Sequence, residues 1–367
     1  MNRFLLATAL ALWASCAAAQ IVIGQTAGFS GPEAAGAKDS AEGARLYFER
    51  VNAGGGVNGQ KIELVTLDDR FDATLAAANA KALITERNAL ALFMSRGLAP
   101  TQAIAPLLAQ HKVVLVAPAT GAMALRTPVQ PWIFLTRASY QREMEKAVQH
   151  LVSIGASRVA LAHVDDAFGA DAAAGVLRAL DKTRQRAAFL LRFKRDKPDM
   201  APIVAGVAKL DIQALVLIGP AAAVADATRQ LRSKGSRATV VTISNNASPE
   251  FVQALGEAGR GVIVTQVVPY ERSSPAPLVK EAYDLAAAKG LNEVTPAMLE
   301  GFAGAKVLVE GLKRAGPKPT RQKLHDALET MSRVDIGGLE VSYSDQDHSG
   351  LEYADLSIIG PDGKFRR

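Results

Sequence analysis

Short apolar runs alternate with helix-like segments through most of the chain. Runs rich in β-branched residues predict a first series of strands at 21–25, 61–67, 89–94, 113–117 and 132–136. Segments with apolar residues every three to four positions fill the gaps, for example 34–52 and 75–87. Strand alternating with helix indicates βαβ units, in which helices cover both faces of a parallel sheet.

A second series of the same kind follows the first. Its expected strands are 158–163, 187–193, 214–218, 239–243 and 261–267, and its expected helices are 171–180, 201–210, 222–234 and 249–255. Two successive series predict an α/β protein with two doubly wound lobes. After residue 268 the pattern changes to longer helices, at 278–289, 297–315 and 320–331, and to short strands at 339–343 and 355–359.

The first nineteen residues have the features of a secretory signal peptide. Arg3 is basic, residues 4–13 are apolar but too few to span a bilayer, and Ala17 to Ala19 form a small-residue cleavage site. We expect cleavage before Gln20 and a periplasmic location. An alternative interpretation makes Cys16 the lipid-modified residue of a lipobox. Cys16 is the only cysteine, so the cleaved chain would contain neither a disulfide nor a thiolate site.

Composition and motifs argue against several classes of protein. The net charge of +6 comes from scattered basic residues, which does not predict nucleic-acid binding. The glycines of GGGVNG, at 54–59, follow a helix and precede a strand, the reverse of a dinucleotide fingerprint, so we interpret them as a helix end and expect no cofactor. The histidines are scattered, and no metal site is expected. Asp165 and Asp166 could act in acid–base catalysis, but an aspartate between a strand and a helix is typical of an N-cap.

Small or polar turns follow the strands of both series. They are TAGFSGP, SRGLAPTQ and PATGA in the first series and DDAFG, GPAA and SNNAS in the second. In open α/β sheets, ligands bind beyond the carboxyl ends of the strands, and helix N-termini there offer unpaired N–H groups to an anion. With no catalytic constellation, the pattern favours a cleft that binds and releases a ligand.

The chain resembles the periplasmic substrate-binding proteins of ABC transporters, and specifically their branched-chain amino acid (Leu/Ile/Val) family. The resemblance extends from about residue 21 to the C-terminus and rests chiefly on SGPEAAG, NAGGGVNGQKIELVTLDD, LAPTQAIAPLLAQHKVVLVAPATGA and GEAGRGVIVT. It implies the type I fold, in which three hinge crossovers join two Rossmann-like lobes with parallel sheets. We expect a signal peptide at 1–19, an N-terminal lobe at 20–137 plus 268–345, and a C-terminal lobe at 138–267 plus 346–367. The expected crossovers lie near 137–140, 268–270 and 344–350.

The same resemblance implies a set of ligand-binding residues. Turns matching SRGLAPTQ and PATGA hold the carboxylate in the family, while an aromatic residue covers the ligand and an acidic residue meets its ammonium group. Leu98 stands where the family commonly has a serine. In the turn where the family has the acidic residue, this chain has the uncharged Ser244 and Asn245. Asp165 or Asp166 could replace that acid, and Arg96 could support an anion. The candidates are Gly97, Leu98, Ala99, Thr101, Ala119, Thr120, Gly121, Tyr140, Asp166, Phe168, Gly219, Ser244 and Asn245.

The resemblance predicts an extracytoplasmic receptor and not an enzyme. We expect a monomer that binds a small amino acid of the branched-chain type in the interlobe cleft and delivers it to a membrane ABC permease. Because the acidic residue is missing from SNNAS, an amine-free carboxylate, such as an aromatic or keto acid, is an alternative ligand. A ligand-sensing module is an alternative role.

Overall fold

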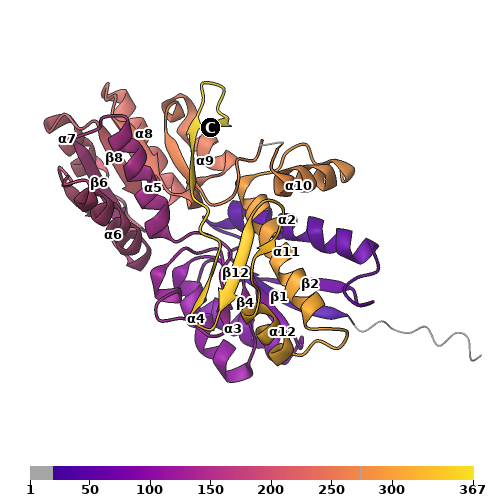
Figure 1. Ribbon diagram of the computed structural model, residues 1–367. Helices are drawn as coiled ribbons and strands as arrows, with labels where there is room; N and C mark the ends of the chain where they lie inside the picture. The colour runs from indigo at the N-terminus through magenta and orange to yellow at the C-terminus, as the bar shows by residue number, and fades with distance from the viewer. Residues whose placement is uncertain (1–19, 273–274) are drawn as a thin grey trace, which may run out of the picture.

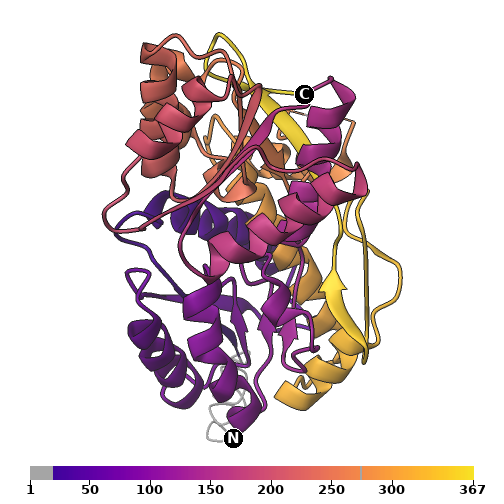
Figure 2. The same cartoon turned by 90° about the vertical axis from the view of Figure 1, so that its left-hand side faces the viewer.

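The computed structural model describes residues 20–272 and 275–367, which form two helix-covered sheets lying one beyond the other (Figures 1 and 2). The first sheet has the order β2-β1-β3-β4-β5, and every pair in it is parallel. Its strands are β1 (Ile21–Ala27), β2 (Ile62–Asp68), β3 (Ala91–Phe93), β4 (Leu115–Val116) and β5 (Ile133–Phe134). Its early helices are α2 (Ala34–Ala53), α3 (Ala73–Thr85) and α4 (Leu98–His111). We call this sheet and its helices the first lobe.

The second sheet has the order β15-β14-β10-β9-β8-β6-β7, in which β6 to β10 are parallel and β14 and β15 are antiparallel additions. Its strands are β6 (Val159–Val164), β7 (Leu190–Phe193), β8 (Ala214–Ile218), β9 (Thr239–Thr242), β10 (Ile263–Gln266), β14 (Asp355–Ile359) and β15 (Phe365–Arg366). Its helices are α5 (Tyr140–Ser153), α6 (Ala167–Lys182), α7 (Ala201–Lys209), α8 (Ala221–Ser233) and α9 (Pro249–Leu255). We call this sheet and its helices the second lobe.

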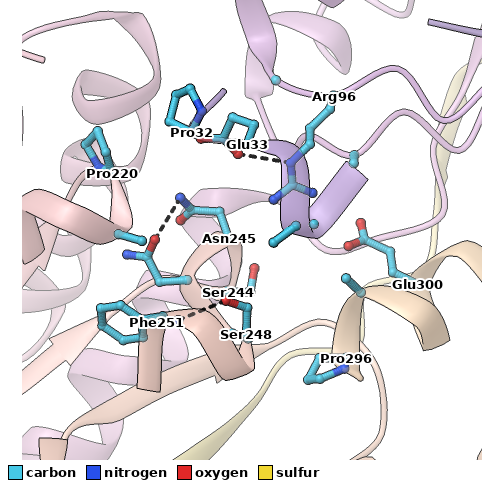
Figure 3. Close-up of a pocket in the computed structure, with 18 of the residues that line it drawn as sticks. Pro32, Glu33, Arg96, Pro220, Ser244, Asn245, Ser248, Phe251, Pro296 and Glu300 are labelled. Atoms are coloured by element: carbon cyan, nitrogen blue, oxygen red, sulfur yellow. Dashed lines mark hydrogen bonds and ion pairs between the residues drawn. The ribbon is translucent and has the colours of Figure 1, made fainter. Parts of the chain in front are cut away.

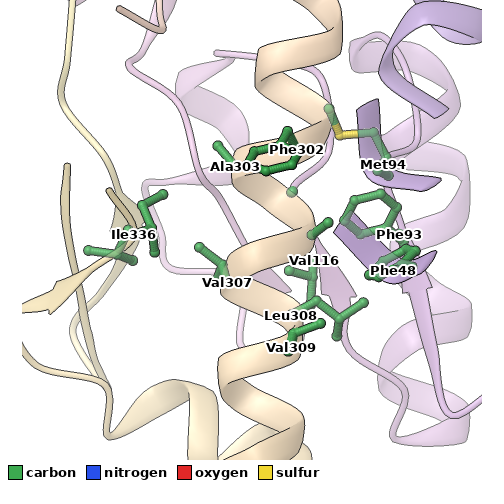
Figure 4. Packing of buried hydrophobic residues seen from close by; sticks show 14 of the residues in the cluster. Phe48, Phe93, Met94, Val116, Phe302, Ala303, Val307, Leu308, Val309 and Ile336 are labelled. Carbon is green, nitrogen blue, oxygen red and sulfur yellow. The ribbon is translucent and has the colours of Figure 1, made fainter. Parts of the chain in front are cut away.

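The later helices return to the first lobe. They are α10 (Pro277–Ala288), α11 (Pro296–Arg314) and α12 (Arg321–Glu329), and a small antiparallel sheet of β11 (Val334–Asp335), β12 (Glu340–Ser344) and β13 (Asp347–Gly350) follows them. Phe302 and Leu308 of α11 are fully buried in a core that includes Phe93 of β3 (Figure 4). A Cβ added to Gly43 of α2 would lie 1.9 Å from the Met298 carbonyl oxygen of α11, so close contact between these helices requires glycine.

The predicted parallel sheets and their alternation with helices are confirmed, because every predicted strand overlaps an observed one. Strands β11, β13 and β15 were not predicted; they are two to four residues long, too short for a clear alternating pattern. The glycine-rich segment does end a helix: α2 stops at Ala53, and Gly56 turns at φ 79° with its backbone against the Gln60 carbonyl.

The chain passes between the lobes three times. The first passage precedes α5 and the second follows β10. The third follows β13, which pairs with β12 and whose His348 carbonyl accepts a hydrogen bond from Leu135 N–H at 2.9 Å. The division into lobes stays a prediction, and these contacts favour placing its third boundary after Gly350 instead of after residue 345.

Two predictions concern residues that the structure does not describe. The signal peptide and Cys16 lie within residues 1–19, outside the described part of the chain. Within residues 20–272 and 275–367, no helix is both long and apolar enough to cross a membrane.

Candidate functional site

A pocket of about 320 Å³ lies between the lobes, at the carboxyl ends of both parallel sheets. Turns after β3, β4, β6, β8 and β9 all contribute to its wall, which is where a doubly wound fold binds ligands. Seven predicted site residues line it: Gly97, Leu98, Ala119, Tyr140, Phe168, Ser244 and Asn245.

The turn between β3 and α4 forms part of the first-lobe wall. Helix α4 begins at Leu98, so the N–H groups of Leu98 and Ala99 have no acceptor within the helix. Gly97 precedes them with φ 84°, and an added Cβ would lie 2.5 Å from the ring of Phe71. Only glycine meets both conditions, and the turn presents the positive end of the α4 dipole to the pocket.

The two predicted threonines form hydrogen bonds that stabilise the turns, and they are not among the residues that line the pocket. Thr101 is fully buried and donates to the Gly97 carbonyl at 2.7 Å. Thr120 is also fully buried, and its hydroxyl accepts a hydrogen bond from the Tyr140 hydroxyl at 3.0 Å. An added Cβ at Gly121 would lie 2.7 Å from the Tyr140 nitrogen. The PATGA turn therefore supports Tyr140, which does line the pocket.

Two aromatic residues, Tyr140 and Phe168, form part of the second-lobe wall. The rings of Tyr140 and Phe168 meet edge to face with 5.0 Å between their centres. Asp166 is not among the lining residues; it is the N-cap of α6 and accepts from Gly169 N–H at 2.9 Å, which confirms its capping role. Its other oxygen accepts from Arg195 Nε at 2.8 Å.

Gly219 is also not among the lining residues. An added Cβ would lie 2.6 Å from the Phe193 side chain. The neighbouring Pro220 lines the pocket instead and precedes the first turn of α8 (Figure 3).

A buried ionic network underlies the pocket where the lobes meet. Arg137 donates to the Glu300 carboxylate at 3.0 Å, to Glu143 at 2.9 Å and to the Ser244 hydroxyl at 2.7 Å. Glu143 also accepts hydrogen bonds from the Ser244 N–H and the Thr265 hydroxyl. Burial disfavours the charged form of Arg137, but the two carboxylates outweigh burial and raise the pKa of the guanidinium above its usual value.

Sequence reasoning missed Arg137, Arg195 and Glu300 as lining residues. Arg137 and Glu300 are 163 positions apart, and Glu300 has only the pattern of a helical residue in its own segment. Arg195 lies in a polar loop after β7 with no motif around it. Of these three residues, only Arg137 could have been identified from the sequence, because it is a charged residue next to a predicted crossover.

Arg96 does line the pocket, and it is paired. Its Nε donates to the Glu33 carboxylate at 3.0 Å, and both side chains face the pocket (Figure 3). A Cβ at Gly36 would lie 2.4 Å from the Arg96 guanidinium, so glycine on α2 allows this approach.

The charged lining residues balance in formal charge. They are Arg96, Arg137 and Arg195 with Glu33, Glu250 and Glu300. A balanced wall with separate cationic and anionic groups suits a zwitterion better than an ion of one sign. In the described part of the chain, no cluster of three or more His, Cys, Asp or Glu residues could hold a metal ion.

Comparison with known proteins identifies similar chains. A family model described as "Periplasmic binding protein" matches residues 20–357. The Leu/Ile/Val-binding protein of Escherichia coli (strain K12) is 23% identical over 310 residues, which cover 84% of this chain and 83% of that protein.

Solved structures agree with these matches. A substrate-binding periplasmic protein from Ralstonia solanacearum is 32% identical with a TM-score of 0.85, covering 94% of this chain and 99% of that one. An extracellular ligand-binding receptor from Verminephrobacter eiseniae is 30% identical with a TM-score of 0.86, and the match covers 95% of this chain and 100% of that one. These proteins are named for binding, and none of the three for catalysis.

Proposed function

The chain belongs to the periplasmic binding protein family, in the branch with the Leu/Ile/Val-binding proteins, and on that premise we propose that it captures a small amino acid and delivers it to an ABC permease. The observation that carries this proposal is an interlobe pocket into which the first lobe presents both the N-terminus of α4 and the carboxylate of Glu300. The family consists of binding proteins, so the expectation that this is not an enzyme is confirmed.

The carboxylate of the amino acid would bind at the start of α4. The Leu98 and Ala99 N–H groups and the helix dipole favour an anion there, and Arg96 lies next to them. The rings of Tyr140 and Phe168 would exclude water from this contact, which strengthens it.

The ammonium group would bind at Glu300. A desolvated ammonium needs an anionic partner, and the SNNAS turn has none. Glu300 reaches the pocket from α11 in the first lobe, and only its Oε1 bonds to Arg137; Oε2 makes no hydrogen bond within the described residues. Its carboxylate extends from the helix toward the pocket (Figure 3). With the Ser244 hydroxyl, it would replace the acid that the turn lacks.

Calorimetric titration tests this proposal with a matched pair of ligands. We expect L-leucine, L-isoleucine, L-valine or L-threonine to bind with submillimolar affinity, and the 2-keto analogue of the best ligand to bind at least about tenfold more weakly. If no amino acid binds with a Kd below about 1 mM, the proposal is wrong. If the keto acid binds as tightly as the amino acid, the ammonium site is wrong.

Export and monomeric state are part of the same proposal. N-terminal sequencing of secreted protein should begin at Gln20, whereas lipidation would leave a modified Cys16 at the N-terminus and add the mass of its acyl chains. Light scattering after size exclusion should give the mass of one chain. The alternative role, a ligand-sensing module, would instead require a partner regulator or sensor, and the family matches do not favour it.

A further inference from the structure

Gln266 ends β10 with a side-chain amide that has no hydrogen-bond partner among the described residues. The residue is 2% exposed, its Nε2 is fully buried, and it lines the pocket. A buried amide without a partner costs free energy, and native proteins satisfy the large majority of such groups. Where such a residue lines a ligand pocket, a group on the ligand is the natural partner.

Asn245 presents the opposite polarity in the same pocket. Its Nδ2 donates to Asn246 at 3.3 Å, but its Oδ1 is buried and has no partner in the described part of the chain. Figure 3 shows Asn245 in the pocket beside Ser244. The short helix η3 (Ser244–Asn246) contacts β10, and β10 pairs with β9, so the two amides come from adjacent segments.

The side chain of Asn246, next to Asn245, shows that a polar group in this turn can be fully hydrogen-bonded within the protein. Asn246 is 1% exposed and donates to the Gly219 carbonyl at 3.1 Å and to the Thr242 hydroxyl at 2.9 Å. Thr265, next to Gln266, is likewise bonded to Glu143. Both segments are therefore held firmly, while Gln266 Nε2 and Asn245 Oδ1, on two residues that line the pocket, have no partner among the residues that the structure describes.

We propose that Gln266 and Asn245 form a polar subsite for the side chain of the ligand. This inference rests on the proposed function and specifies the class of amino acid. The Gln266 amide offers a donor and the Asn245 carbonyl an acceptor, so the matching side chain both accepts and donates hydrogen bonds. An uncharged hydroxyl or carboxamide does this, as in threonine, serine, asparagine or glutamine.

Aliphatic and charged side chains fit this subsite less well. An aliphatic side chain would offer no partner to Gln266 Nε2 or to Asn245 Oδ1, and sites built for hydrogen bonding discriminate strongly against ligands that lack the group. A charged side chain would upset the balance among the three arginines and three glutamates of the wall. The pocket thus selects a neutral polar side chain.

Titration calorimetry with two ligand series tests the inference. The purified protein is titrated with the four polar amino acids and with leucine, isoleucine and valine. We expect the best polar ligand to bind at least about fivefold more tightly than any aliphatic one. The Gln266→Leu variant should lose about five- to twentyfold in affinity for the polar ligand and keep or improve its affinity for leucine. Gln185→Leu is the matched control, and it should bind like the wild type. The buried Oε1 of Gln185 also has no partner within the described chain, but Gln185 is not among the pocket-lining residues.

Each contrary outcome has a distinct meaning. If the wild type prefers an aliphatic amino acid, the polar subsite is wrong and the proposed function stands. If Gln266→Leu weakens both series equally, Gln266 has a structural role and the inference fails. If no amino acid binds, the proposed function fails and this inference fails with it. The wild-type comparison decides the matter even if Gln266→Leu does not fold.

Discussion

Arg195 of the second lobe lies over the ring of Phe71 in the first lobe, with 5.8 Å between the guanidinium carbon and the ring centre. The same guanidinium lies 6.0 Å from the centre of the Phe168 ring and is paired with Asp166 at 2.7 Å. All three of the stacked side chains line the pocket. The contact therefore joins the two lobes directly beside the bound ligand's expected position.

Replacing Arg195 by Met should weaken ligand binding. The change removes a cation–π contact across the pocket, which contributes about 0.5–1 kcal/mol at a partly exposed site, or roughly two- to fivefold in Kd. Calorimetry measures this effect. Arg192→Met is the matched control, since Arg192 pairs with exposed Asp165 outside the pocket. Equal losses in the two variants would contradict a role for the interlobe contact.

Replacing Glu300 by Gln should selectively weaken the binding of amino acids. Loss of the proposed ammonium partner should cost about 2–3 kcal/mol, or more than about thirtyfold in Kd, with a smaller effect on the amine-free keto analogue. Glu310→Gln on the same helix is the control, because Glu310 pairs with Arg314 away from the pocket. An equal loss for the amino acid and its keto analogue would place the ammonium elsewhere.

Replacing Arg137 by Met should destabilise the fold strongly. The fully buried Glu143 and the mostly buried Glu300 would lose their shared cation, and breaking such a network costs about 3–5 kcal/mol in the free energy of unfolding. Urea denaturation measures this quantity. Arg142→Met, which removes an exposed pair with Glu145, should change it by less than about 1 kcal/mol. A loss for Arg137→Met as small as for Arg142→Met would show that the network adds little to stability.

Glu271 should make stability fall as the pH rises toward neutrality. Burial raises the pKa of its carboxyl from 4.5 to about 7, and its Oε2 has no partner in the described residues. The folded state therefore binds the proton more tightly, so its stabilising contribution is present below about pH 4.5 and is lost as the pH passes 7. The full loss is of order 3 kcal/mol.

The Glu271→Gln variant measures this contribution. Its free energy of unfolding should fall less than that of the wild type between pH 5 and pH 8, and exposed Glu257→Gln serves as the control. The lowered pKa of buried His348 acts in the opposite direction, with stability lost as the pH falls, and both variants retain it. Parallel pH profiles for the wild type and Glu271→Gln would contradict the prediction.

Much of the local structure could be predicted from the sequence because its causes are local. The apolar runs marked the strands, and Asp166 between a strand and a helix was interpreted correctly as an N-cap. The glycines of GGGVNG were identified as a helix end from their order relative to the neighbouring elements. The turns at the carboxyl ends of the strands indicated where the pocket would lie.

Which side chains face that pocket was decided by tertiary structure. Thr120 lies in a turn that the sequence predicts to bind the ligand, but its hydroxyl is hydrogen-bonded to the Tyr140 hydroxyl. Tyr140 lines the pocket, and Thr120 does not. Arg137 meets Glu300 and Arg195 meets Phe71 only because the two lobes fold against each other. Sequence periodicity determines which face of a strand or helix is buried, but a charged or polar side chain takes its partner from whichever distant segment the fold brings within reach.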